Sequence, residues 1–364
     1  MANEIKVLVI GNYGTLISAR PEAEAVIGLF KKGIKITVIS RKDTEYSRRF
    51  IDEGIRFIGA YPERKYDLRF IRLVRKELKE GGYHILQLFS NNSIYNGLIA
   101  SLGISVKVVL YRGYTGNIHW YDPSCYLKYL NWRVDKIICL AEAIREMFHR
   151  QLFFKKEKAI TINKGHDPQW YETIRPSDYS EFGLPVNIFK ISCVANARRM
   201  KGIKYLIMAM DKLPIQMPIH LFLIGSDMDK GELKRLISRC KFNTQIHVTG
   251  YRNDSLNLVA GSDLFILPSI KGEATTKALI EAMSLGIPSV TTSIPGNREL
   301  AINGTTALTV PVKNPAALAT AIEQLYYNSE LRKKIGWQSK QHVINNFHIN
   351  DTVRKISDLY KELV

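Results

Sequence analysis

Two glutamates beside a polar loop are the residues whose spacing says most about chemistry. Glu273 and Glu281 lie eight positions apart, in a segment where a helix is expected to start near Thr276. Eight helical residues span roughly 12 Å, more than the roughly 5 to 10 Å between the paired carboxyl groups of a glycosidase. The spacing suits one carboxylate on a ribose diol and the other on a sugar, with a diphosphate near the helix N-terminus. Two solvated glutamates on an ordinary helix would show the same spacing.

A group of cations marks a second candidate site. Arg198, Arg199 and Lys201 directly follow the apolar stretch Phe189 to Ala195, which is expected to be a strand. Cations at the carboxyl end of a strand can hold phosphate oxygens, since arginine binds them bidentately and lysine acts as a point charge. A solvated basic loop is the alternative interpretation.

Short β-branched runs alternate with helix-like segments along the whole chain, which predicts parallel sheets built from βα units. The runs of the first half are Ile5 to Ile10, Lys35 to Ile39, His84 to Phe89, Val106 to Tyr111, Lys136 to Leu140 and Ala159 to Ile162. Those of the second half are Phe189 to Ala195, Ile219 to Ile224, Ile246 to Thr249, Leu264 to Leu267, Pro288 to Thr291 and Ala307 to Val310.

The predicted fold class is therefore α/β, with two doubly wound, Rossmann-like domains facing each other across a cleft. The polar, proline-containing stretch from Lys164 to Pro185 marks the junction between them. We expect an N-terminal domain over residues 1–167 and a C-terminal domain over 168–345. The amphipathic C-terminal helix, about 346–364, is expected to return to the first domain.

The composition favours an anionic partner. Lysine and arginine number 52 against 34 acidic residues, a net charge of +18, which suits a sugar nucleotide, an anionic lipid surface or a nucleic acid. The four cysteines are scattered, so we expect reduced thiols. No leader or membrane-spanning segment is expected, and the predicted location is cytoplasmic, with a peripheral position on the inner face of the cytoplasmic membrane as an option.

Both candidate sites resemble glycosyltransferase family 4, a group of retaining enzymes of the GT-B type. Glu273 and Glu281 resemble the family's E-x7-E motif, and Arg198 to Gly202 resembles its basic loop. Further similarities are Leu223-Ile224-Gly225, Val248-Thr249-Gly250, Ser262-Asp263, Gly286-Ile287-Pro288 and Ser293 to Glu299. The first half resembles the family more loosely, at Gly11 to Gly14, Arg133 to Leu140 and Lys164 to Asp167.

This resemblance implies transfer of a sugar from a nucleoside-diphosphate sugar, with retained anomeric configuration and without a metal or other cofactor. The N-terminal domain would bind the acceptor and the C-terminal domain the donor. Lys201 would stabilise the departing phosphate with help from Arg198 or Arg199, Glu281 would bind the ribose, and Glu273 would contact the sugar. The remaining donor-binding positions that the resemblance implies are Thr275, Thr276, Lys277, Asn196, Gly225, Tyr251 and Gly14.

The chain departs from the family pattern at three places. Ala274 to Thr276 stand where glycines and an aromatic residue are usual, and Asn196 occupies the usual position of a cation. Arg112-Gly113 replaces a histidine that often follows the strand expected at Val106 to Tyr111. Arg112 and His119 are the candidates to enter the active site in its place, although His119 beside Trp120 is also typical of a packing residue.

Two basic amphipathic stretches, Lys65 to Lys79 and Ile144 to Lys158, could lie on anionic lipid or could face the protein core. The predicted partners are a nucleotide-sugar donor, a glycan or lipid-linked acceptor and an anionic membrane. The protein is expected to be a monomer or a weak dimer. The predicted function is glycosyl transfer in cell-surface polysaccharide or lipopolysaccharide synthesis. A GT-B enzyme that modifies nucleic acid, a sugar-nucleotide-binding protein without catalysis and a nucleotide-sugar epimerase remain as alternatives.

Overall fold

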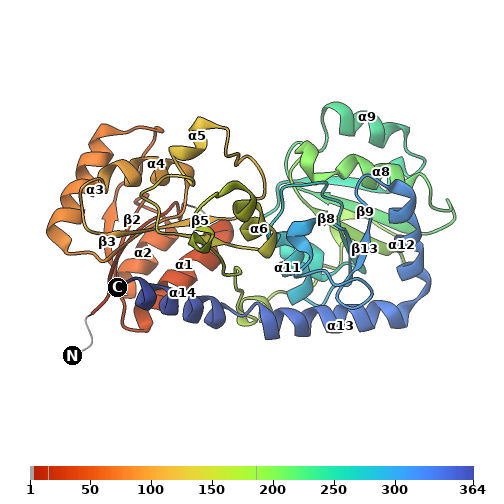
Figure 1. Cartoon of the computed structure of the whole chain (residues 1–364). Coiled ribbons are helices and arrows are strands. Elements are labelled where there is room, and N and C mark those ends of the chain that lie inside the picture. Colours follow the sequence, from red (N-terminus) through yellow and green to blue (C-terminus); the bar gives the residue numbers. More distant parts are fainter. Residues whose placement is uncertain (1–3, 15, 186) are drawn as a thin grey trace. The chain divides into compact units, whose positions relative to one another are not determined.

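The computed structural model describes residues 4–14, 16–185 and 187–364 (Figure 1). The chain forms two compact units, one of residues 1–166 with 347–364 and the other of residues 167–346. Met1 to Asn3, where the sequence analysis expects no leader, and Val186 lie outside the described residues.

The first unit contains a parallel sheet, in which the described residues form seven strands in the order β3-β2-β1-β4-β5-β6-β7. The strands are β1 (Lys6–Ile10), β2 (Lys35–Ser40), β3 (Arg56–Gly59), β4 (Ile85–Leu88), β5 (Lys107–Arg112), β6 (Lys136–Cys139) and β7 (Ala159–Thr161). The strand order reverses between β1 and β4. Because their side chains are mostly apolar on both faces, helices cover both sides of the sheet (Figure 1).

The helices of this unit begin and end as follows: α1 (Leu16–Lys31), α2 (Glu45–Asp52), α3 (Leu68–Gly81), α4 (Asn91–Ala100), α5 (Pro123–Tyr126), α6 (Glu142–Gln151), η1 (Lys156–Lys158) and α14 (Ile349–Leu363). The C-terminal helix α14 packs on α1, where a Cβ atom on Gly28 would lie 2.6 Å from Val353. The buried Tyr360 hydroxyl donates a hydrogen bond to Gln87 on β4. The expected return of the C-terminal helix to the first domain is thus confirmed.

The second unit has its own parallel sheet, for which the described residues give the order β10-β9-β8-β11-β12-β13. Its strands are β8 (Phe189–Val194), β9 (Ile219–Ile224), β10 (Ile246–Gly250), β11 (Leu264–Leu267), β12 (Ser289–Thr292) and β13 (Leu308–Val310). The order reverses between β8 and β11, which pair through Leu264 with Ile191 and Phe265 with Ser192.

Helices cover both faces of this sheet as well (Figure 1). They are α7 (Gln169–Glu172), η2 (Ser180–Phe182), η3 (Arg199–Lys201), α8 (Ile203–Met210), α9 (Gly231–Arg239), η4 (Asn243–Gln245), α10 (Ser255–Ala260), α11 (Lys277–Ser284), η5 (Pro295–Asn297), α12 (Pro315–Tyr327) and α13 (Ser329–Asn346). Helix α8 packs against α9 and α12, and α11 packs against α10 and α13. The predicted pair of doubly wound sheets is confirmed.

The two basic stretches, Lys65 to Lys79 and Ile144 to Lys158, contain apolar side chains that are buried in the first unit. In α3, the apolar side chains Phe70, Ile71, Val74 and Leu78 are buried in the core, as the core-facing interpretation expects. Helix α6 ends at Gln151, so the second stretch is not one helix to Lys158, and its Met147 and Phe148 are buried. For these two side chains the structure matches the core-facing interpretation, because they pack inside the unit.

Candidate functional site

The candidate site lies where the strand order of the second sheet reverses. Strands β8 and β11 are neighbours there, and the chain leaves their carboxyl ends in opposite directions. Open parallel sheets bind ligands at such a point, because the two loops diverge and leave a crevice. The loop after β8 carries Lys201 and the loop after β11 carries Glu273.

Backbone contacts fix these two loops against each other. Gly202 has φ +67°, and a Cβ atom there would lie 2.0 Å from the carbonyl oxygen of Pro268, so only glycine fits. The N–H of Ile270 donates to the carbonyl oxygen of Met200 at 2.8 Å. The position of Lys201 relative to Glu273 is therefore set by the backbone on both sides.

Lys201 and Glu273 form a buried ion pair. The Lys201 Nζ atom lies 2.5 Å from Glu273 Oε1, and the two side chains are 18% and 10% exposed. Ser269 Oγ donates to the same carboxylate oxygen at 2.8 Å, and the Thr292 hydroxyl in turn donates to the Ser269 carbonyl. Low solvation strengthens charge interactions, so burial strengthens the attraction between these two side chains.

Helix α11 begins beside this ion pair without a side-chain cap. Thr276 is its N-cap residue, but its hydroxyl donates to Asn297 Oδ1 at 2.7 Å and forms no cap hydrogen bond. The preceding Thr275 has φ +44°, a strained backbone for a β-branched residue, and its N–H donates to the Gly296 carbonyl at 3.1 Å. Among the residues that the structure describes, no side chain caps the first amides of α11, as an anion-binding helix N-terminus requires.

The second glutamate of the motif lies one turn further along α11. Glu281 forms an ion pair with Lys277, and the two side chains are partly buried. Each glutamate is therefore held by a lysine. A diphosphate bound at the start of α11 could draw Lys201 and Lys277 towards its oxygens and leave the carboxylates to accept hydrogen bonds from sugar hydroxyls.

The structure brings Lys201, Glu273, Thr275, Thr276, Lys277 and Glu281 to one edge of the sheet, but it places the two arginines differently. Arg198 and Arg199 are exposed and line a cavity of about 420 Å³ together with Lys204, Lys230 and Lys313. Lys204 and Lys230 are paired with Glu232 and Asp227. Neither arginine touches the Lys201–Glu273 ion pair through any hydrogen bond described here, so their predicted role at the leaving phosphate stays a prediction.

Three other donor-binding candidates lie at neighbouring strand ends. The N–H of Gly225 donates to the Gly250 carbonyl at 2.8 Å, which joins the ends of β9 and β10. Asn196 is exposed in the loop after β8, and Tyr251 is 71% exposed just after β10. Both side chains are accessible to a ligand, and their predicted contacts with the donor remain predictions.

The candidates of the first unit are engaged in local structure. Arg112 donates to the carbonyl oxygens of Tyr114 and Gly116 at 2.9 and 2.7 Å, and its guanidinium lies 4.8 Å from the ring centroid of Tyr129. The His119 ring stacks on Tyr121, with centroids 5.1 Å apart. These contacts match the packing interpretation for His119 and give Arg112 a role in shaping its own loop.

Gly14, the remaining candidate of the first unit, is exposed after β1. Its N–H donates to Asn12 Oδ1 at 3.3 Å. The predicted contact of this glycine with a donor stays a prediction.

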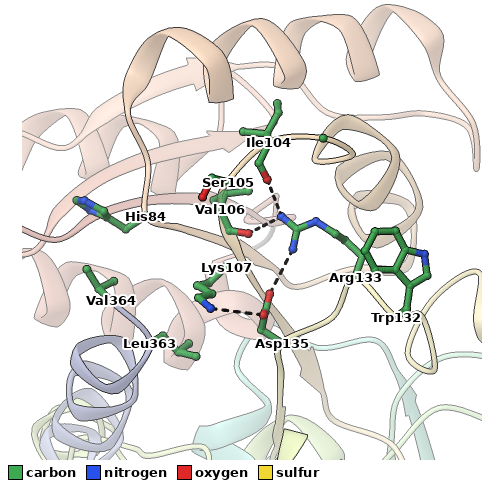
Figure 2. Close-up of a pocket in the computed structure, with 11 residues that line it drawn as sticks. His84, Ile104, Ser105, Val106, Lys107, Trp132, Arg133, Asp135, Leu363 and Val364 are labelled. Atoms are coloured by element: carbon green, nitrogen blue, oxygen red, sulfur yellow. Dashed lines mark hydrogen bonds and ion pairs between the residues drawn. The ribbon is translucent and has the colours of Figure 1, made fainter.

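The first unit contains a cavity of about 520 Å³ whose polar side chains are used in contacts within the protein (Figure 2). It is lined by His84 and Lys107, which stand at the amino ends of β4 and β5, away from the edge where parallel sheets bind ligands. Figure 2 shows Arg133 directed at the carbonyls of Ile104 and Val106 and at Asp135. These donors tie down the chain before β5 and are not free for a ligand.

Sequence reasoning missed two residues of the site. Ser269 holds Glu273, and Asn297 holds Thr276, while the Asn297 Nδ2 atom is buried with no hydrogen-bond partner among the described residues. A serine directly after a buried strand end was the available signal for Ser269. Asn297 lies 21 positions from Thr276 and gave no local signal.

Comparison with known proteins identifies the family. A sequence model described as Glycosyltransferase Family 4 matches residues 23–170, and one described as Glycosyl transferases group 1 matches residues 176–342. The chain belongs to glycosyltransferase family 4.

The fold of this family 4 chain is the GT-B fold, as solved structures show. A glycosyltransferase from Rickettsia africae superposes with a TM-score of 0.82 at 21% identity, covering 99% of each chain. The Anabaena protein HepE, solved in complex with UDP-glucose, superposes with a TM-score of 0.77 at 18% identity, covering 99% of this chain and 100% of HepE.

A curated relative of the family 4 chain is the Escherichia coli UDP-Gal:alpha-D-GlcNAc-diphosphoundecaprenol alpha-1,3-galactosyltransferase. It is 27% identical over 243 residues, which cover 63% of this chain and 60% of the relative. The chain spans 48% to 60% of the length of the first curated relatives it matches. Within the described residues, no helix has the length and apolar character that a bilayer crossing needs.

Proposed function

We propose that this family 4 chain transfers a sugar from a nucleoside-diphosphate sugar to a glycan or lipid-linked acceptor, in the synthesis of a cell-surface polysaccharide or lipopolysaccharide. The observation that carries the proposal is the buried Lys201–Glu273 ion pair beside the uncapped start of α11. A diphosphate needs cations and free amides, and a sugar needs carboxylates that accept from its hydroxyls. The site offers both.

In the proposed reaction, the bond between the anomeric carbon and the diphosphate oxygen breaks, and a bond from that carbon to the acceptor oxygen forms. Lys201 moves from Glu273 to the leaving phosphate, whose growing negative charge it stabilises. Glu273 then accepts hydrogen bonds from the sugar, and Glu281 from the ribose. The acceptor oxygen bonds to the face of the anomeric carbon that the diphosphate leaves, so the configuration is retained. The acceptor proton passes to the departing phosphate, so neither a dedicated protein base nor a metal is needed.

The names of similar proteins support a first choice of donor and setting. HepE was solved with UDP-glucose, and the Escherichia coli relative is named for UDP-galactose and an undecaprenol-diphosphate acceptor. UDP-sugars are therefore the first donors to test, and a polyprenyl-diphosphate-linked sugar is the first acceptor. A lipid-linked acceptor of this kind suits a cytoplasmic protein at the inner face of the cytoplasmic membrane.

The test is a thermal-shift screen of the chain with UDP, other nucleoside diphosphates and their sugars. A donor at a hundredfold excess over its Kd should add about 2.7 kcal/mol of stability. Glu281→Ala and Lys201→Ala should each abolish the shift, while Glu172→Ala and Lys234→Ala, exposed residues of the same unit, should retain it. Persistence of the full shift in both site variants would place the donor elsewhere.

Product analysis separates the proposal from its alternatives. With a bound donor and the polyprenyl-linked acceptor, we expect free nucleoside diphosphate and a glycosylated lipid, also in the presence of EDTA. Conversion of the donor without any acceptor would instead indicate an epimerase. Donor binding without turnover on any acceptor tested would indicate a binding protein.

A further inference from the structure

Large apolar side chains gather on one surface of the first unit. We call this surface the aromatic patch. Its members are 44% to 84% exposed, and they are Trp120, Tyr121, Tyr126, Leu127, Trp132, Phe153 and Phe154. Isolated exposed hydrophobic residues are ordinary, but a contiguous group of aromatic ones marks an interaction site.

The aromatic patch is one surface although its members come from two separate segments. The Trp120 N–H donates to Gln151 Oε1 at 3.0 Å, and the Trp120 and Phe153 rings meet edge to face with centroids 5.4 Å apart. A groove of about 290 Å³ is lined by Tyr126, Trp132, Phe153 and Phe154 among others. The segment around α5 and the chain after α6 therefore present their aromatic side chains together.

Local structure directs these side chains outward. Helix α6 buries Met147 and Phe148 and then ends at Gln151, so that Phe153 and Phe154 fall in the following turn. Lys155, the residue before η1, has φ +56°, a left-handed conformation. The apolar residues of α6 therefore pack in the core, whereas the two phenylalanines that follow the helix are exposed.

The rim of the aromatic patch is basic. Residues 150–158 contain Arg150, Lys155, Lys156 and Lys158 but only one acidic residue, Glu157. Lys155 and Lys158 line the groove itself, and Lys128 lies in the other segment. Asp122, the acidic residue of that segment, accepts a hydrogen bond from the backbone N–H of Ser124 at the start of α5.

We propose that the aromatic patch docks on a lipid bilayer that contains anionic headgroups. Tryptophan, tyrosine and phenylalanine enter the interface between headgroups and acyl chains, where an amphipathic ring is stable, while lysines beside them attract anionic lipid. The charge complementarity of the basic rim selects a membrane over an uncharged protein surface. This inference goes beyond the proposed glycosyl transfer and does not depend on it.

The test is co-sedimentation of the full chain with vesicles of phosphatidylcholine alone or mixed with phosphatidylglycerol. We expect binding to the mixed vesicles that weakens as salt rises, because salt screens the lysines. The triple variant Trp132→Ala, Phe153→Ala, Phe154→Ala should bind them at least about tenfold more weakly. The double variant Lys155→Gln, Lys156→Gln should lose the preference for phosphatidylglycerol.

Two controls keep the experiment decisive. The variant Trp337→Ala, Tyr327→Ala removes equally exposed aromatic residues from the second unit, and it should bind vesicles like the wild type. Thermal melting checks that the triple variant is folded. Vesicle binding by the triple variant at wild-type strength, or none by the wild type, would overturn the proposal.

Two further results would assign the aromatic patch to another occupant and also overturn the proposal. One is a wild-type dimer that the triple variant converts to monomer, measured by sedimentation velocity, since a second copy would then cover the surface. The other is duplex DNA binding that the triple variant loses while vesicle binding is absent.

Discussion

Two short, buried lysine–glutamate ion pairs, Lys164–Glu22 in the first unit and Lys201–Glu273 in the second, have different surroundings. Lys164 Nζ lies 2.5 Å from Glu22 Oε1 in the first unit, the same separation as between Lys201 and Glu273 in the second. Both pairs are similarly buried. Distance and burial alone therefore do not distinguish a structural pair from a ligand site.

Their neighbours do distinguish them. Glu22 also accepts a hydrogen bond from Tyr111, whose hydroxyl pKa is raised well above its usual value by burial and then by the Glu22 charge. The space beside Glu22 is about 10 Å³ and is closed by Thr352 and Tyr360 of α14, so it holds no ligand. Glu273 instead lies among loops at a strand-order reversal, beside an uncapped helix. A buried charge pair marks a site when the groups around it are also left for a ligand.

Lys201→Ala should produce the largest effect on function. Loss of the cation that stabilises the leaving phosphate should lower kcat by about 10²- to 10³-fold, as for loss of one charge-stabilising donor in other enzymes. The measurement is the initial rate of nucleoside diphosphate release with a donor and acceptor identified as above. Lys164→Ala, which breaks the corresponding pair of the first unit, should leave the kcat of the folded protein within a few-fold of wild type. Equal losses in the two variants would contradict the distinction between the pairs.

Glu22→Ala should act on stability instead. It leaves Lys164 buried without its partner, which should cost roughly 3 kcal/mol of unfolding free energy. Urea unfolding followed by fluorescence measures this cost, and the nucleotide-induced thermal shift should remain. Glu53→Ala breaks the more exposed pair with Lys31 and should cost less than about 1 kcal/mol. A cost for Glu22→Ala as small as that of Glu53→Ala would show that the buried pair is not structural.

The sequence predicted the two sheets well because their strands are continuous β-branched runs. The strand it missed, β3 (Arg56–Gly59), is a short edge strand whose side chains are half-buried or exposed, so it lacks an apolar run. The predicted start of α11 at Thr276 is confirmed to within one residue, since a threonine precedes an apolar helical stripe.

The contacts within the site could not be predicted from the sequence. Lys201 and Glu273 lie 72 positions apart and meet only because β8 and β11 are neighbours, an order that periodicity does not contain. The aromatic patch also could not be predicted from the sequence. Its two segments meet through Trp120, Gln151 and Phe153, and the sequence of the basic stretch does not show that α6 ends at Gln151 and leaves Phe153 exposed.

The smallest expected effect is a pH dependence that belongs to the second unit. Burial, and then the charge of His220, lower the pKa of His247 to about 4 from a usual 6.5. The two rings stack with centroids 5.2 Å apart, and their Nδ1 and Nε2 atoms share a hydrogen bond of 2.9 Å. Between pH 6.5 and 4 the unfolded chain binds a proton at His247 that the folded chain does not, so folding stability should fall as the pH falls through this window.

The variant His247→Phe isolates this effect, because phenylalanine keeps a ring beside Phe222, which stacks on His247 with centroids 4.7 Å apart. Loss of the hydrogen bond to His220 should shift its urea midpoint at every pH, so only the slope between pH 6.5 and 4 reports protonation. That slope should be shallower than in the wild type. Trp337→Ala, which removes an exposed side chain of the same unit that does not titrate, should show the wild-type slope. Parallel curves for wild type and His247→Phe would show that His247 titrates alike in the folded and unfolded chain, and that the acid sensitivity of the second unit comes from other groups.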